Sequence, residues 1–179
     1  MILSDEQLKA IVPLSLEVDR RLFGLYFNKH QNSKFGIPDN EVAAFIAQVA
    51  HESFYFHYLT EIGRRSYFDK YEHRKDLGNT YAGDGYTYRG RGYIQLTGRA
   101  NYTAFRDWLG GKPDVVLHPE LVAQPNLGVL AALYFWQTKK CGEVSNDIVK
   151  LTKRINGGLN GLDNRTSLYK RAREVLYED

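Results

Sequence analysis

The chain has 179 residues, of which 43% are hydrophobic and 25% charged, so it is long enough for one soluble globular domain and too short for two ordinary ones. Its single cysteine, Cys141, excludes a disulfide framework within the chain and is expected to be a small core residue. The net charge of +3 is mild and the basic residues lie among tyrosines and glycines, a pattern that does not favour nucleic-acid binding.

The first 21 residues show no basic lead followed by an apolar run, so neither a signal peptide nor a membrane anchor is expected. No later stretch is long and apolar enough to cross a bilayer, and membrane insertion is not expected. The chain shows no repeat or linker, and we expect a single domain over residues 1–179.

The spacing of apolar residues predicts a mostly helical chain. Helices are expected over 5–12 and 14–29, with Pro13 in the first turn of the second, and another is expected to open at Pro38. The glycine-rich residues 63–88 indicate a loop, and 86–98 a short, bent β-hairpin. Further helices are predicted over 99–109, 119–139, 145–155 and 163–177. The fold class is therefore α+β, predominantly α-helical.

Glu52 lies at the edge of an apolar stripe in the helix that follows Pro38. It comes seven residues after Phe45, so at 3.6 residues per turn it returns to nearly the same face, while His51 points away. A carboxyl placed there is partly desolvated, which favours its protonated form, and a protonated carboxyl can donate its proton to a glycosidic oxygen. A solvated carboxyl at the end of the helix remains the plain alternative.

Glycoside hydrolysis usually needs a second carboxylate. An unbroken helix would put Glu61 on the opposite face from Glu52 and roughly 13 Å along the axis, which cannot make a pair. Either the helix breaks near residues 54–60, or Glu61 is an ordinary surface residue. The other nearby carboxylates are Asp69, Glu72, Asp76 and Asp84.

Other chemistries are weakly represented in the sequence. His51 and Glu52 begin like a zinc-protease helix motif, but Tyr55 stands where that motif needs histidine. There is no nucleophile-elbow motif and no phosphate-binding loop. No metal site and no cofactor are expected.

Several segments together resemble glycoside hydrolase family 19, which contains chitinases and a branch of phage endolysins. They are FIAQVAHES (45–53), YRGRGYIQLTGRANY (88–102), the segment from Pro119 to Trp136, and INGGLNG followed by Arg165. The resemblance implies a lysozyme-like fold with a small β-element beside a cleft, and an inverting mechanism.

The resemblance also assigns roles by motif position. It implies Glu52 as general acid, Glu61 as general base and Thr97 as a holder of the attacking water. Substrate-binding roles are expected for Tyr88, Gln95, Asn101, Asn156 and Arg165, with Asn156 and Arg165 lining the cleft and tuning the carboxylates. A base near Arg64, Arg65 or Arg165 would stay ionised.

The second acid lies further from the first in the plant enzymes, so Glu72 is kept as an alternative base. Three features resemble the endolysin branch. The cysteine framework is missing, Asn160 stands at a position that is often acidic in the plant branch, and no wall-binding module is expected. That branch implies a muramidase-type endolysin acting on peptidoglycan. It would stay in the host cytoplasm until release into the periplasm, with a holin as functional partner, and act as a monomer.

Two alternatives remain open. The first is a chitinase that cuts chitin oligomers, which present the same N-acetyl groups. The second is a glycan-binding protein that kept the fold without catalysis, although both Glu52 and Glu61 are present.

Overall fold

The structure is a computed structural model that describes residues 1–178, and helices are the only named regular elements in that range. The α-helices are α1 (Asp5–Ile11), α2 (Glu17–Gln31), α3 (Val42–Glu52), α4 (Asp84–Thr87), α5 (Arg99–Trp108), α6 (Pro125–Thr138), α7 (Ile148–Asn156) and α8 (Leu162–Tyr177). Short 3-10 helices are η1 (Asp39–Glu41), η2 (Arg65–Tyr71), η3 (Lys75–Leu77), η4 (Pro119–Ala123) and η5 (Cys141–Val144).

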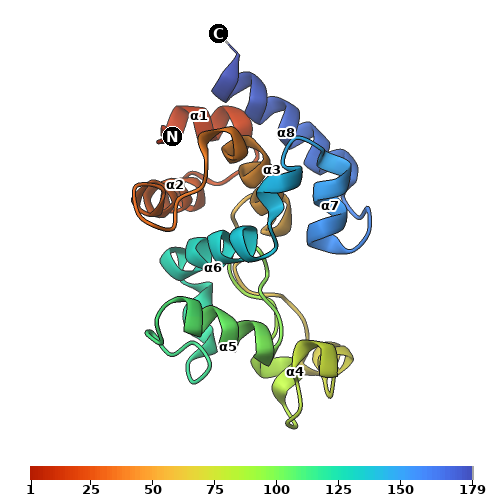
Figure 1. Cartoon of the computed structure of the whole chain (residues 1–179). Helices are drawn as coiled ribbons and strands as arrows, with labels where there is room; N and C mark the ends of the chain where they lie inside the picture. Colours follow the sequence, from red (N-terminus) through yellow and green to blue (C-terminus); the bar gives the residue numbers. More distant parts are fainter. Residues whose placement is uncertain (179) are drawn as a thin grey trace.

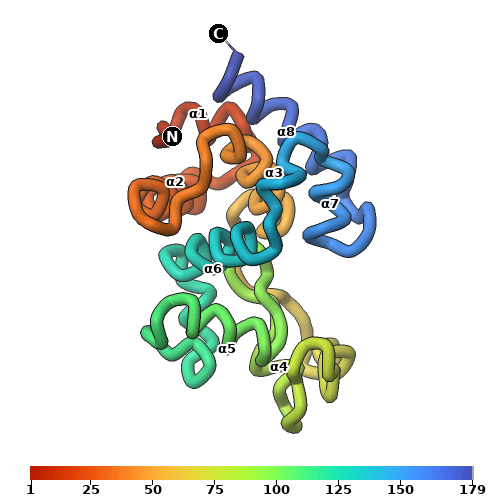
Figure 2. The backbone as a smooth tube through the Cα atoms, in the orientation of Figure 1, coloured from red at the N-terminus to blue at the C-terminus, as the bar shows by residue number. Residues whose placement is uncertain are grey.

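The molecule has a larger and a smaller part, with α6 between them (Figure 1). Helices α1, α2, α3, α7 and α8 form the larger part, and both chain ends lie there (Figure 2). The smaller part holds α4 and α5. Each part has its own hydrophobic core, and α6 contributes to both: Leu133 and Trp136 to the larger, Leu130 and Tyr134 to the smaller. This double packing explains why α6 is apolar around its whole circumference.

Helix α3 is the centre of the larger part. All nine residues from Val42 to Ala50 are buried, so the helix is covered on every side and not on one stripe alone. Ala43, Ala47 and Ala50 carry small side chains, and α8 packs along this helix. Cys141 belongs to the same core, as expected from the sequence, and burial raises the pKa of its thiol to about 12.

Two predicted helices differ from the structure at proline. Pro13 does not open α2, because Val12 ends α1 and a turn from Val12 to Ser15 comes before the helix starts at Glu17. The helix predicted over 119–139 is divided into η4 and α6 at Pro125. Gln124 before it is extended, as a residue preceding proline usually is.

The β-hairpin predicted over 86–98 is not confirmed as a pair of strands. Its first residues belong to α4, and one isolated antiparallel bridge, Arg91 to Leu96, is closed by two backbone hydrogen bonds; a second bridge joins Arg91 to Thr60. Gly92 has a positive φ of 74° and packs against Gly128 of α6, so the segment lies on a helix and not in a sheet. The segment predicted as a loop over 63–88 contains three short helices, η2, η3 and α4.

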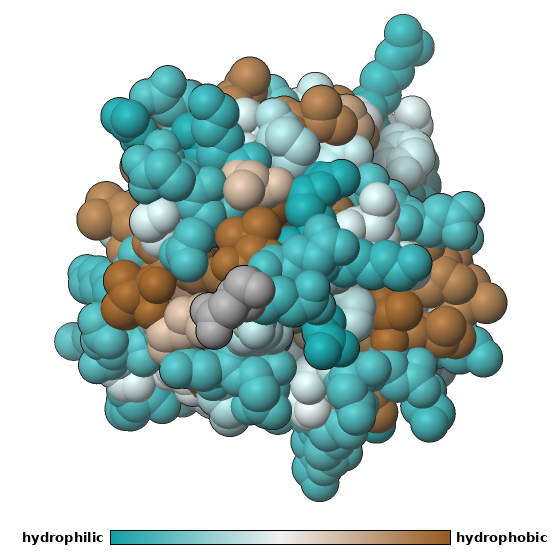
Figure 3. Space-filling model, turned by 90° about the horizontal axis from the view of Figure 1, so that it is seen from above, coloured by the Kyte–Doolittle hydropathy of each residue, from teal (hydrophilic) through white to brown (hydrophobic). Residues whose placement is uncertain are grey.

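The surface at the α1 and α8 end is largely hydrophilic, with separate hydrophobic patches (Figure 3). Large apolar side chains exposed on α2 or just before it are Leu14, Leu16, Val18 and Leu25. Within residues 1–178, no helix combines the length and the hydropathy that a membrane span needs.

Candidate active site

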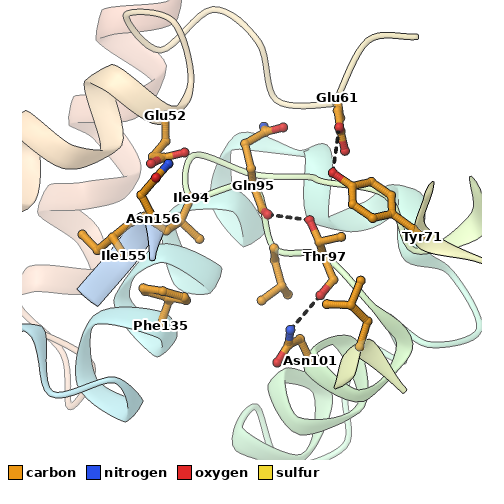
Figure 4. A pocket seen from close by; sticks show the side chains of 12 residues that line it. Glu52, Glu61, Tyr71, Ile94, Gln95, Thr97, Asn101, Phe135, Ile155 and Asn156 are labelled. Carbon is orange, nitrogen blue, oxygen red and sulfur yellow. Dashed lines mark hydrogen bonds between the residues drawn. The ribbon is translucent and has the colours of Figure 1, made fainter. Parts of the chain in front are cut away.

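A cavity of about 470 Å³ lies where the two parts of the molecule meet, and it gathers most of the residues singled out from the sequence. Glu52 and Asn156 line its side on the larger part, and Glu61 and Tyr71 line the opposite side (Figure 4). The full lining is Glu52, Glu61, Tyr71, Leu77, Ile94, Gln95, Leu96, Thr97, Asn101, Phe135, Ile155 and Asn156.

Glu52 is the last residue of α3, and its side chain is 19% exposed. Arg165, a buried residue of α8, donates to Oε1 of Glu52 and also to the side-chain oxygen of Gln48. The Arg165 Nε–H donates to the carbonyl of Asn160 at 3.2 Å, so the guanidinium is fixed on three sides. Within residues 1–178, Oε2 of Glu52 accepts no hydrogen bond, and Glu52 lines the cavity.

The helix breaks immediately after Glu52, as a pairing of the two glutamates requires. Ser53 caps it, and Phe54, Tyr55 and Phe56 then have positive φ values of 51°, 62° and 73°. Three successive non-glycine residues in the left-handed region carry backbone strain, which proteins concentrate at functional sites. This left-handed turn sends the chain across the cavity toward Glu61.

Glu61 is fixed by the main chain and by its side chain. Its N–H donates to the carbonyl of Gly90 at 2.8 Å, and the N–H of Gly90 donates back to Oε2 of Glu61 at 3.1 Å. Oε1 accepts from the hydroxyl of Tyr71 at 3.0 Å and from Nζ of Lys70 at 3.3 Å. Every contact to this carboxyl is a donor, which suits a carboxylate that acts as a base.

The floor between the two glutamates is a hydrogen-bonded chain. Gln95 has a positive φ of 55°, and its Nε2 donates to the carbonyls of Tyr58 and Gly92. The Thr97 hydroxyl donates to the carbonyl of Gln95 at 2.9 Å, and Asn101 Nδ2 donates to the carbonyl of Thr97 at 2.7 Å (Figure 4). The hydroxyl hydrogen of Thr97 is therefore already donated, and the hydroxyl oxygen can accept a hydrogen bond from a water.

Six of the eight predicted site residues line this cavity: Glu52, Glu61, Gln95, Thr97, Asn101 and Asn156. Tyr88 does not line it. Its side chain is 3% exposed in the smaller core and its hydroxyl donates to the carbonyl of Val116, so the expected substrate contact is replaced by a packing role. Arg165 is buried behind Glu52 and does not line the cavity either.

The structure places the alternative base elsewhere. Glu72 accepts from the N–H of Gly83 at 3.1 Å and closes the loop around Gly85, away from the cavity lining. The expected distribution of cations also needs correction. Arg165 lies against Glu52, not against the base, and the cation beside Glu61 is Lys70 in place of Arg64 or Arg65.

Lys70 and Tyr71 are site residues that the sequence did not indicate. They lie on η2, a short 3-10 helix within a segment whose composition predicts only a loop, so no periodicity marked them. Among residues 1–178, no group of three or more His, Cys, Asp or Glu side chains is arranged to hold a metal ion.

Comparison with known proteins shows which family the sequence matches. The family profile Glyco_hydro_19, described as chitinase class I, matches residues 31–156. A glycosyl hydrolase family 19 domain-containing protein of Haemophilus influenzae is 46% identical over 101 residues, covering 56% of this chain and 48% of its own. An endochitinase of Arabidopsis thaliana is 35% identical over 124 residues, covering 68% of this chain and 41% of its own.

These matches span less than half of the length of either relative. Among solved structures, chitinase C from Streptomyces griseus superposes with a TM-score of 0.71 at 21% identity, covering 98% of this chain and 76% of that one. The likeness shows that the mostly helical fold is shared with this chitinase.

Proposed function

The chain belongs to glycoside hydrolase family 19 and is a glycoside hydrolase; we propose that its substrate is the β-1,4-linked glycan strand of bacterial peptidoglycan, cut as an endolysin of the muramidase type. The observation that carries the choice of polymer is the position of the positive charge. The chemistry is supported by two carboxyls on opposite sides of one cavity.

In this proposal the glycosidic bond is broken by inversion. Glu52 donates a proton to the leaving glycosidic oxygen while Glu61 takes a proton from a water that attacks the anomeric carbon from the other side. Arg165 occupies Oε1 of Glu52, so Oε2 is the oxygen that carries the proton. The hydroxyl oxygen of Thr97 accepts a hydrogen bond from the same water, and this contact orients a lone pair of the water toward the anomeric carbon.

The amide side chains suit a sugar that carries N-acetyl groups. Gln95 uses its Nε2 on two backbone carbonyls, which leaves its Oε1 to accept from an amide N–H or a hydroxyl. Asn101 and Asn156 lie at the floor and on the α7 side (Figure 4). Apolar lining by Ile94 and Phe135 matches the faces of sugar rings.

Positive charge is concentrated on the part of the chain that holds Glu61. Residues 61–99 carry eight Lys/Arg and five Asp/Glu, so the whole net charge of +3 lies in this segment and the rest of the chain is balanced. Chitin is uncharged, whereas the peptide stems of peptidoglycan bear carboxylates. The net positive charge of residues 61–99, called the basic wall below, therefore favours binding of the second polymer.

Two arginines on this wall are available for such carboxylates. Arg65 and Arg89 flank the ring of Tyr86, at 4.8 and 4.1 Å from its centroid. Within residues 1–178, no carboxylate lies within ion-pair distance of either, whereas Arg74 pairs with Asp76 on the same part. The Arg89 Nη1 donates to the carbonyl of Tyr86 at 2.8 Å, so Arg89 offers its remaining donors to a carboxylate, while Arg65 offers its planar fork.

The test uses three substrates: peptidoglycan, the same glycan strands freed of peptide by an amidase, and chitin hexamer. Wild type, the double variant Arg65→Gln/Arg89→Gln and the control Arg74→Gln are compared by mass spectrometry of the products. The double variant is expected to raise KM about 10-fold on the peptide-bearing strand alone. An equal effect on all three substrates would refute recognition of the stems.

Chitin oligomers are the second candidate, because relatives of this chain are named endochitinases. Cleavage of chitin hexamer with no cleavage of peptidoglycan would establish it, and retention of a glycan without turnover would favour a binding protein. The endolysin proposal includes monomeric action, release from the host cytoplasm to the periplasm, and a holin as functional partner.

A further inference from the structure

Two contacts to Glu61 take no part in the proton transfers described above. The Tyr71 hydroxyl donates to Oε1 at 3.0 Å and the Lys70 ammonium donates to the same oxygen at 3.3 Å. The other oxygen, Oε2, accepts only from the N–H of Gly90, at 3.1 Å, among the described residues. The two oxygens of this carboxylate therefore differ in how many donors they meet.

A carboxylate oxygen offers two lone-pair directions. Oε1 has both engaged, one by Tyr71 and one by Lys70, while Oε2 keeps one free. An attacking water can give its hydrogen only to an oxygen with a free lone pair in reach. Gly90 also leaves the side of Oε2 without a side chain: a Cβ on Gly90 would lie 3.2 Å from Oε2 and 2.9 Å from Oε1 of Gln95, between two acceptors for a water.

Tyr71 is suited to act as a permanent donor. Its ring is partly buried and lines the cavity. Burial, and next the negative charge of Glu61, raise the pKa of Tyr71, so the hydroxyl keeps its proton across the neutral range. A hydroxyl with a firmly held proton can orient the carboxylate without competing for the proton that Glu61 accepts.

Lys70 is held in place by aromatic rings. Its Nζ lies 3.5 Å from the ring centroid of Tyr67 and 4.6 Å from that of Tyr71. Both distances are within the range of a cation–π contact. The side chain is 42% exposed, so the rings supply the order that burial does not.

We propose that Tyr71 and Lys70 are positioning residues that saturate Oε1 of Glu61, so that Oε2 alone, beside Gly90 and Gln95, takes the proton of the attacking water. The inference rests on the proposed role of Glu61 as general base. It adds to that role the atom that acts and the two side chains that select it.

The test compares wild type, Tyr71→Phe, Tyr81→Phe, Lys70→Gln and Glu61→Gln on whichever soluble glycan the wild type cleaves. Tyr71→Phe keeps the ring that contacts Lys70 and removes only the donor to Oε1. It is expected to lower kcat about 10-fold with KM nearly unchanged, because the contact serves the transition state. Lys70→Gln is expected to lower kcat about 3-fold, and the exposed contact explains the smaller loss.

Tyr81→Phe is the matched control, since Tyr81 is 66% exposed and its hydroxyl contacts neither Glu61 nor Lys70, and it should keep the wild-type kcat and KM. If Tyr71→Phe keeps wild-type kcat while Glu61→Gln is inactive, the positioning inference is wrong and the base assignment stands. If Glu61→Gln stays active, the base assignment itself fails. Equal kcat losses in Tyr71→Phe and Tyr81→Phe, matched by equal losses of thermal stability, would also overturn the inference.

Discussion

The two sides of the cleft hold their glutamates in different ways. Glu52 ends a fully buried helix and is held by Arg165, which is 1% exposed and fixed by three acceptors. Glu61 lies on an irregular chain and is held by Lys70, Tyr71 and the N–H of Gly90. Yet the two carboxyls have equal exposure, 19% each. The two carboxyls are therefore distinguished by their partners and by how rigidly those partners are held, not by depth of burial.

The largest expected effect is that of Glu52→Gln. Glutamine has the shape of the carboxyl but carries no transferable proton, so turnover should fall about 10³-fold while substrate binding persists. Release of reducing ends from purified peptidoglycan measures the turnover, and pull-down with the insoluble polymer measures binding. Activity within a few-fold of wild type would show that Glu52 is not the acid.

Gly90→Ala is expected to damage the Glu61 side without a change of charge. Its methyl group would meet Oε2 of Glu61 at 3.2 Å and Oε1 of Gln95 at 2.9 Å, in the space assigned to the water. A displaced base costs about 10²-fold in kcat. Gly158→Ala is the matched control, since its Cβ would meet only Asn156 Oδ1, at an ordinary 3.7 Å. Equal activity of the two variants would contradict the proposed position of the attacking water beside Gly90.

The two ion pairs should differ in their weight on stability. Arg165→Gln leaves part-buried acceptors without their cation and is expected to lower the free energy of unfolding by about 3 kcal/mol. Lys70→Gln removes an exposed contact and should cost less than about 1 kcal/mol. Urea unfolding of both variants checks the comparison, which fails if their midpoints coincide.

The smallest expected effect concerns acid stability of the Glu61 side. Burial opposes the ionised form of Asp84, but the hydrogen bonds from Arg99, the N–H of Tyr81 and the charge of Arg99 together outweigh it and lower the pKa of Asp84 below its ordinary value of 3.8. A lowered folded-state pKa gives stability that is present above the ordinary pKa and is lost as the pH falls through the lowered value. Asp84→Asn should therefore reduce stability at pH 7 and flatten its decline below about pH 4. An unchanged pH profile of the melting temperature would contradict this.

The contrast between the two sides also explains what the sequence could predict. The spacing of Phe45 and its neighbours in a regular helix predicted Glu52 at the edge of an apolar face, and in the structure Glu52 ends α3 and lines the cavity. The partner of Glu52 could not be found in that way, because Arg165 is 113 residues distant in the chain and its packing is a tertiary property.

On the Glu61 side of the cleft, predictions from the local sequence pattern agreed less well with the structure. The predicted hairpin is reduced to the single bridge between Arg91 and Leu96, and Gly92 within it packs against Gly128 of α6. Lys70 and Tyr71 lie on a 3-10 helix too short to show a period. Glu61 itself was placed by family resemblance, and the left-handed turn at residues 54–56 that brings it to the cavity has no signature in composition.

The most direct test of the account is the anomeric configuration of the first product, followed by proton NMR during cleavage of a soluble β-1,4-linked glycan by the wild-type protein. A base at Glu61 that activates water against a bond protonated by Glu52 predicts that the α-anomer appears first and then mutarotates. Appearance of the β-anomer first would mean retention through a covalent intermediate, and would contradict the division of labour between the two sides of the cleft.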